Sequence, residues 1–258
     1  MPDLRLETAA GVATLTLDRP DALNSLTVGL KQELLGAVAT IAARPAIRAV
    51  VLTGAGRAFC AGQDLRERLE PDAAPLADEI RLRYNPLIRA MRDLPKPIVA
   101  AVNGIAAGAG ASLALACDIR IAAEGASFLL AFGRVGLVPD SGATWLLARL
   151  IGGAKAAELA LLGEAMSAAD AERFGLVARV VPVEHVVAEA QAVAARLAAG
   201  APRALALTKH ALDRAWTSTF ADQLELEADL QGEAGATADH AEGIAAFLEK
   251  RPARFSGE

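Results

Sequence analysis

The sequence is poor in the residues that build metal sites, disulfide frameworks and nucleic-acid surfaces. Its three histidines, His185, His210 and His240, are far apart and lack the spacing of metal ligands, so we expect no metal centre. The two cysteines, Cys60 and Cys117, are interpreted as reduced thiols of a cytoplasmic protein, since they are too few for a disulfide framework. The net charge of −5 argues against a nucleic-acid partner, which usually needs a basic face.

Long uninterrupted apolar segments are also missing. Residues 1–12 contain three charged side chains and no apolar signal core. The uncharged stretch 97–117 is interrupted by one proline and several glycines, whereas a membrane helix needs about 20 consecutive apolar residues. We therefore expect a protein without a membrane-spanning segment.

What the chain does have is enough apolar material for a large core. Hydrophobic residues make up 53% of its 258 residues and charged residues 22%, which predicts one folded α/β domain, with or without a small appendage. Alanine is abundant and aromatic residues are only 4% of the chain, a composition that suits helices packed closely on a sheet.

The first half of the sequence predicts alternating strands and helices. Buried strands that alternate with helices favour parallel pairing through crossovers. The expected elements are a hairpin of strands 4–7 and 12–17, a helix 27–43 with Thr27 as N-cap, a strand 49–52, a glycine-rich loop 54–64, a surface loop or lid 66–75, a helix 76–94, a strand 97–102, a turn 104–110, a helix 111–116 and a strand 119–122.

The second half predicts mostly helix. Apolar residues recur at three- and four-residue intervals in segments 183–199, 202–216, 219–234 and 238–249, and 177–181 is a possible strand. We divide the chain into a core, residues 1–195, and a C-terminal helical region, residues 196–258. The sequence leaves open whether the last helices pack on the core or on another subunit.

Three glycine-rich segments follow buried strands and are candidates for a site. Segments 56–65 and 102–111 can turn main-chain N–H groups toward a ligand, although tight connections and close helix packing are equally simple readings. In segment 133–144, Asp140 follows Pro139 and precedes small residues. This aspartate is either an N-cap or a carboxylate in an apolar pocket, where burial would raise its pKa and suit it to proton transfer.

Taken together, these segments resemble the enoyl-CoA hydratase/isomerase (crotonase) family. The likeness extends from the N-terminal hairpin to Arg251 and includes 18–24, 59–65, Lys96-Pro97, 103–110, Cys117-Asp118 and 245–251. It implies a crotonase (ClpP-like) spiral of ββα units with a C-terminal helical trimerisation region, assembled as a homotrimer or hexamer. It also implies an acyl-CoA substrate, with CoA as the thioester moiety and no tightly bound cofactor.

The resemblance also implies roles for particular residues. The main-chain N–H groups of Ala61 and Ala109 align with the pair that holds the thioester oxygen, and Asp140 aligns with the acid/base. Positions near CoA are Ala22, Ala61, Gly62, Gln63, Asp64 and Leu65, together with Phe247 and Lys250, which resemble residues that reach a neighbouring subunit's CoA. Tyr84, Phe132 and Pro139 are expected in the substrate pocket, with a core position as the alternative for Tyr84.

Two departures from the family pattern favour isomerisation. Family hydratases use two glutamates to activate water, and the aligned positions here are Ser112 and Phe132. The chain therefore resembles family isomerases with a single aspartate, which convert ring-epoxide phenylacetyl-CoA to oxepin-CoA or shift 3-enoyl-CoA to 2-enoyl-CoA. The alternatives are a hydratase-type lyase and a non-catalytic member that binds CoA esters.

Overall fold

Two β-sheets organise the chain, for which a computed structural model describes residues 3–258. The larger sheet has six strands in the order β1 (Leu4–Ala9), β2 (Val12–Leu17), β3 (Ala49–Gly54), β5 (Ile98–Val102), β7 (Ile119–Ala123) and β10 (Arg179–Val181). The smaller sheet has four strands in the order β4 (Ala58–Cys60), β6 (Ile105–Ala107), β8 (Ser127–Leu129) and β9 (Ala165–Ser167).

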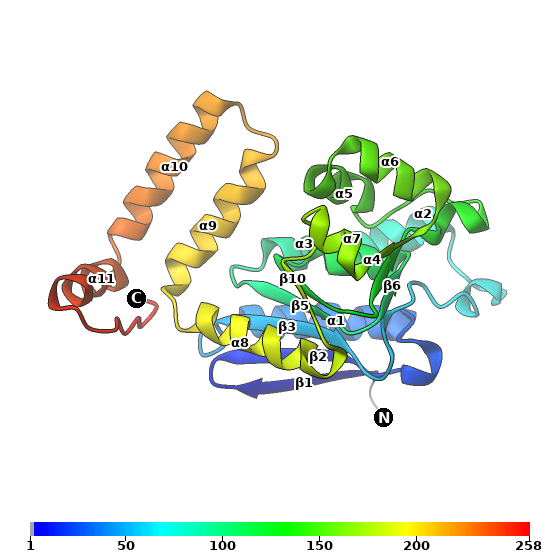
Figure 1. Ribbon diagram of the computed structural model, residues 1–258, viewed down its shortest axis with the longest axis horizontal. Helices are drawn as coiled ribbons and strands as arrows, with labels where there is room; N and C mark the ends of the chain where they lie inside the picture. Colours follow the sequence, from blue (N-terminus) through cyan, green and yellow to red (C-terminus); the bar gives the residue numbers. More distant parts are fainter. Residues whose placement is uncertain (1–2) are drawn as a thin grey trace.

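The pairing within the larger sheet confirms the predicted topology. Strands β1 and β2 form an antiparallel hairpin, and β2, β3, β5, β7 and β10 are parallel to one another. Every residue of β3 and β5 is buried, as expected of parallel strands covered on both faces. Helix α8 (Val186–Ala198) lies against β3, β5 and β7 (Figure 1).

The strands of the smaller sheet were not predicted from the local sequence, although the ββα units that the resemblance implies call for them. Strands β4 and β6 lie inside segments that the sequence indicated as a loop, 54–64, and a turn, 104–110. Each has only three residues, too few for a recognisable alternating pattern. They form strands because β4 pairs in parallel with β6, and β6 with β8.

Each predicted helical segment contains helix, whereas the helices within residues 143–173 lie in the part of the second half that was predicted only as mostly helical. Thr27 is the N-cap of α1, since its Oγ1 accepts a hydrogen bond of 3.1 Å from Leu30 N. The other helices are α2 (Leu76–Glu79), α3 (Asn85–Asp93), α4 (Ala109–Ala116), α5 (Ala143–Ile151), α6 (Gly153–Leu162), α7 (Ala168–Arg173), α9 (Pro202–Ala215), α10 (Phe220–Gly235) and α11 (Ala238–Glu249), and α1 itself is Val28–Ala42.

The segment predicted as one helix, 76–94, is divided by a π-helical turn. This turn, Ile80–Tyr84, separates α2 from α3, and Asn85 N donates to Ile80 O across it. Pro86 follows immediately and has no N–H to continue an α-helical ladder. The wider turn thus accommodates the proline, and such turns occur frequently at functional sites.

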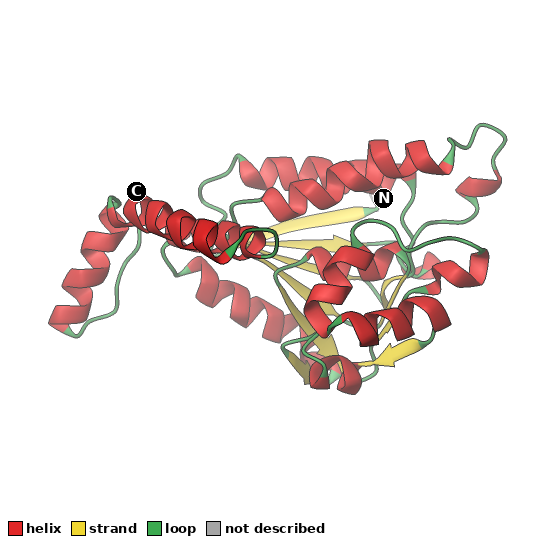
Figure 2. Cartoon of the chain, turned by 90° about the horizontal axis from the view of Figure 1, so that it is seen from above, coloured by secondary structure: helices red, strands yellow, loops and turns green. Residues whose placement is uncertain are grey.

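The C-terminal helices extend away from the sheets (Figures 1 and 2). Helices α9 and α10 lie side by side, and α11 lies beyond them. Helix α9 is attached to the core by ion pairs from Lys209 to Asp118, at 3.0 Å, and from Asp213 to Arg92. Helix α8 packs on the core as far as Ala198, and the division at residue 195 stays a prediction.

Among residues 3–258, no helix has both the length and the apolar character needed to cross a membrane.

Candidate active site

A cavity of about 370 Å³ lies where the three glycine-rich segments meet. Its wall is mostly apolar, and Asp140 is the only ionisable side chain among the residues described as lining it. The lining residues are Ala61, Gly62, Gln63, Leu65, Leu76, Ala77, Ile80, Gly108, Ala109, Ala131, Phe132, Val135, Leu137, Val138 and Asp140. The volume is in the range of pockets that bind small organic ligands.

Asp140 is held in place by two serines. The Oγ of Ser141 donates a 2.8 Å hydrogen bond to Oδ1 of Asp140, and the Oγ of Ser112 donates a 3.1 Å bond to its main-chain oxygen. The N-cap of α5 is Gly142, without a side-chain cap bond, so Asp140 does not act as the N-cap considered above. Its carboxylate is free to face the cavity.

The surroundings of Asp140 favour its protonated form. Burial raises the pKa of this carboxyl group above its ordinary value, while the hydrogen bond from Ser141 and the charge of Lys31 oppose the shift only in part. A carboxylate with a raised pKa is a stronger base and a more useful acid/base near neutral pH.

Two residues that line the same cavity, Gln63 and Ala109, have main-chain N–H groups without acceptors in the described part of the chain. Within residues 3–258, neither Gln63 N nor Ala109 N donates a hydrogen bond. Their segments are in contact, because a Cβ added to Gly62 would lie 3.3 Å from Ala109 N and 2.8 Å from Ala107 O. Gly62 also has a φ of +93°, which favours glycine and lets the loop approach α4 this closely.

This pair differs from the predicted one at one position. Ala61 lines the cavity, but its N–H donates a 2.9 Å hydrogen bond to Leu23 O and is therefore committed. Ala61 is therefore wrong as a free donor, and Gln63 takes its place as the candidate. The sequence contains no signal for Gln63, because a main-chain N–H does not depend on the side chain. Ala109 keeps its predicted place.

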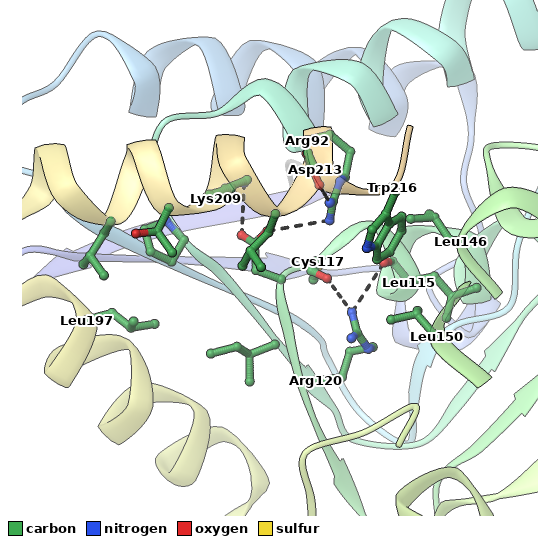
Figure 3. A pocket seen from close by; sticks show the side chains of 16 residues that line it. Arg92, Leu115, Cys117, Arg120, Leu146, Leu150, Leu197, Lys209, Asp213 and Trp216 are labelled. Carbon is green, nitrogen blue, oxygen red and sulfur yellow. Dashed lines mark hydrogen bonds and ion pairs between the residues drawn. The ribbon is translucent and has the colours of Figure 1, made fainter. Parts of the chain in front are cut away.

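Helix α4 is fixed at both ends. A Cβ on Gly110 would collide with Cys60 O, so α4 packs directly on β4. At the other end, the guanidinium of Arg120 donates to the oxygens of Leu115 and Cys117 (Figure 3), and Arg92 donates to Ala116 O at 3.3 Å. Cations at a helix C-terminus stabilise its dipole, and the positive N-terminal end starts at Ala109.

The loop beside Ala109 is ordered by Asp64. Its carboxylate accepts hydrogen bonds from Arg19 at 3.0 Å, Ser25 at 3.1 Å and Arg66 N at 3.1 Å. Burial alone would raise the pKa of Asp64, but these donors hold it below its usual value. Asp64 therefore supports the loop and does not line the cavity, whereas Leu65 lines it and is 57% exposed.

Of the three residues predicted in the substrate pocket, one lines the cavity and two do not. Phe132 lines the cavity and is buried. Tyr84 and Pro139 are not among the lining residues: Tyr84 is 2% exposed and belongs to the hydrophobic core, and Pro139 is half-buried beside Asp140. For Tyr84 the alternative of a core position is confirmed, and for Pro139 the predicted place in the pocket is corrected.

The predicted CoA positions outside the loop are not brought to this cavity within one chain. Ala22 ends a 3₁₀ turn, Pro20–Ala22, and does not line it. Phe247 and Lys250 are exposed and lie at the end of α11, in the region that extends from the core (Figure 1). Their proposed contact with a neighbouring subunit's CoA stays a prediction.

A second cavity, of about 300 Å³, lies between α9 and the core (Figure 3). Its charged groups are paired with one another or with main-chain oxygens: Lys209 and Arg92 contact Asp118, and Arg120 donates to Leu176 O at 2.6 Å. Neither the catalytic candidates nor the 61–65 loop lines it, so we assign no chemistry to it. Within residues 3–258, no three His, Cys, Asp or Glu side chains are grouped to hold a metal ion.

Comparisons with known proteins agree with this geometry. The profile of the family described as Enoyl-CoA hydratase/isomerase matches residues 7–258. The 1,2-epoxyphenylacetyl-CoA isomerase of Escherichia coli (strain K12) is 47% identical over 251 residues, which cover 96% of each chain. The mitochondrial enoyl-CoA hydratase of Pongo abelii is 37% identical over 247 residues, 96% of this chain and 84% of that one.

Solved structures give the same result for the fold. An enoyl-CoA hydratase from Bacillus anthracis matches with a TM-score of 0.92 and 37% identity, covering 99% of this chain and 100% of the other. The relatives include both isomerases and hydratases, so the likeness establishes the family and the crotonase fold. This chain belongs to the enoyl-CoA hydratase/isomerase family.

Proposed function

We propose that this protein is an acyl-CoA isomerase that uses Asp140 as its single acid/base. The observation that carries the proposal is one ionisable side chain, Asp140, in an apolar cavity that also presents the free N–H groups of Gln63 and Ala109. The 1,2-epoxyphenylacetyl-CoA isomerase among the relatives supports the same reaction class.

The proposed reaction moves one proton and leaves the composition of the substrate unchanged. For a 3-enoyl-CoA, the Asp140 carboxylate removes a proton from C2, and the electron pair passes into a dienolate with its negative charge on the thioester oxygen. The N–H groups of Gln63 and Ala109 stabilise that charge, which is worth about 10²–10³ in rate for each donor. Protonated Asp140 then delivers the proton to C4, which gives the 2-enoyl-CoA.

The residues at the two hydratase positions support isomerisation over hydration. Phe132 is buried, lines the cavity and has no group that can bind or activate water. Ser112 is fully buried, and its hydroxyl donates to Asp140 O and lies 3.4 Å from Gly108 O. Neither side chain supplies a base for attack by water.

The reaction class can be tested by analysing the products from three CoA esters. A linear 3-enoyl-CoA and ring-epoxide phenylacetyl-CoA should each give an isomer of unchanged mass, the second an oxepin-CoA. A linear 2-enoyl-CoA should gain water at least about 10²-fold more slowly than the 3-enoyl-CoA is isomerised. The reason is that hydration lacks a positioned base, which commonly contributes that factor. Fast water addition would identify a hydratase, and unchanged esters with retained binding would identify a non-catalytic member.

We further propose that the protein assembles as a trimer or hexamer and that CoA enters only as part of the substrate. Large apolar side chains stand exposed on the C-terminal helices, including Phe220 at 80%, Phe247 at 83% and Leu248 at 74%. A single chain rarely leaves such a group uncovered. Sedimentation equilibrium should give three or six times the mass of one chain, and a monomer at micromolar concentration would contradict the proposal.

A further inference from the structure

Tyr84 carries a buried hydroxyl group that the proposed reaction does not use. It is the only tyrosine of the chain and is 2% exposed. Its Oη is inaccessible to solvent and has no hydrogen-bond partner among residues 3–258. Buried polar groups are nearly always paired, and an exception in a native structure calls for an explanation.

The location of Tyr84 connects it to Asp140. Tyr84 ends the π-helical turn Ile80–Tyr84, and Ile80 lines the active-site cavity. Ile88 lies one helical turn after Tyr84, and its Cγ2 would be 3.9 Å from a Cβ at Gly142, two residues beyond Asp140. Residues four apart share a helix face, so Tyr84 lies on the same face as Ile88, which packs near the turn that carries Asp140.

The charges around the Tyr84 phenol indicate the same neighbour. Burial raises the pKa of Tyr84, and the carboxylate of Asp140 adds the largest charge effect, ahead of Cys60, Glu79 and Glu67. The Lys31 ammonium lies 4.5 Å from the ring centroid and pairs with Glu79, which also pairs with Arg83. These contacts fix the ring, and Lys31 is the cation whose charge acts on Asp140.

The hydrogen bonds of Asp140 leave one oxygen available. Oδ1 accepts from Ser141, whereas no donor within residues 3–258 is assigned to Oδ2. An unpaired buried donor and an unpaired carboxylate oxygen therefore lie on adjoining elements. We propose that Tyr84 is a positioning residue whose hydroxyl donates a hydrogen bond to Oδ2 of Asp140 as the carboxylate turns toward the substrate proton. This inference rests on the proposed function of Asp140.

The test compares Tyr84→Phe, which removes only the hydroxyl, with the parent protein over a range of pH. Turnover should fall as pH drops through the pKa of Asp140, because the proton acceptor is lost. A donor to the carboxylate stabilises its charged form. Removing it should therefore shift the fall in turnover at acid pH (the acid limb of the pH profile) to higher pH by about one unit. The plateau kcat should fall about 10-fold as the base loses orientation, with KM unchanged because Tyr84 does not line the cavity.

Ser141→Ala is the matched comparison, because it removes the donor to Oδ1 and should shift the limb in the same direction. A Tyr84→Phe protein with the parent pH limb and kcat would overturn the inference. In that case the Tyr84→Phe protein, which has lost only an unpaired hydroxyl, should also be at least as stable to urea as the parent protein. If Asp140→Asn remains active, the proposed function itself fails, so the two failures can be told apart.

A spectroscopic measurement tests the contact without any substrate. Because the chain has one tyrosine, 3-fluorotyrosine labelling gives a single ¹⁹F signal. The signal should shift as Asp140 titrates, and the shift should be absent in Asp140→Asn. A signal that is the same in both proteins throughout the acid range would overturn the inference.

Discussion

The Asp140→Asn protein should bind CoA esters nearly as tightly as the parent protein and turn them over about 10²–10⁴-fold more slowly. Asparagine has the size of aspartate and can still accept the hydrogen bond from Ser141 Oγ. It cannot remove a proton, and no second ionisable side chain lines the described cavity to replace it. The expected loss is therefore confined to the chemical step.

This prediction is checked by measuring kcat with 3-enoyl-CoA and the Kd of a saturated, unreactive CoA ester. Asp140→Glu is the informative companion, because it keeps the acid/base and displaces it by one methylene. Its activity should lie between those of the parent and Asp140→Asn. Turnover of Asp140→Asn within a few fold of the parent would show that another group moves the proton.

The second large effect is expected at Ala109, where proline removes the main-chain N–H. Ala109 is the first residue of α4, a position that tolerates proline because its N–H has no intrahelical acceptor. The variant should retain its fold and lose about 10²–10³ in kcat, the usual contribution of one oxyanion donor. The effect should appear in kcat because this donor stabilises the charged dienolate more than the neutral thioester.

Ala109→Gly is the matched control, since it also changes the side chain and keeps the N–H. It should stay within a few fold of the parent in kcat, while circular dichroism and thermal unfolding verify that both variants are folded. Equal kcat values for the proline and glycine variants would remove Ala109 from the proposed donor pair. A proline variant that unfolds at low temperature would be replaced by an amide-to-ester substitution at the same position.

Local sequence patterns indicated the loops around the cavity but not which of their main-chain groups are free. The residues alone left Asp140 as either an N-cap or a pocket carboxylate, and the resemblance to the family favoured the second reading. The structure places it in the wall of the cavity. The predicted loop does line the cavity, but the N–H of Ala61, predicted as the donor, is bonded to Leu23 O, and Gln63 is the donor we propose instead. Every non-proline residue has a main-chain N–H, so the sequence does not distinguish one from another. Only the hydrogen bond to Leu23 O shows that the N–H of Ala61 is already used.

The buried partner of Asp140 could not be recognised before folding. Ser112 belongs to α4, and its hydrogen bond to Asp140 O forms only once α4 packs beside the Asp140 turn. The same holds for the contact that we propose for Tyr84. The smaller sheet is a similar case, because strands of three residues are stable only through their neighbours.

The amino-acid order alone was enough to predict the α/β topology and the terminal helices, because hydrophobic periodicity is a local property. For Asp140 it left two readings open, and the resemblance to the family favoured the acid/base. Packing decided the rest: which N–H groups remain free, that Tyr84 lies in the core, and that Asp140 is the only ionisable side chain among the described residues that line the cavity. Those properties depend on which segments, distant in the sequence, pack together and exclude water. The local sequence pattern does not show which segments these are.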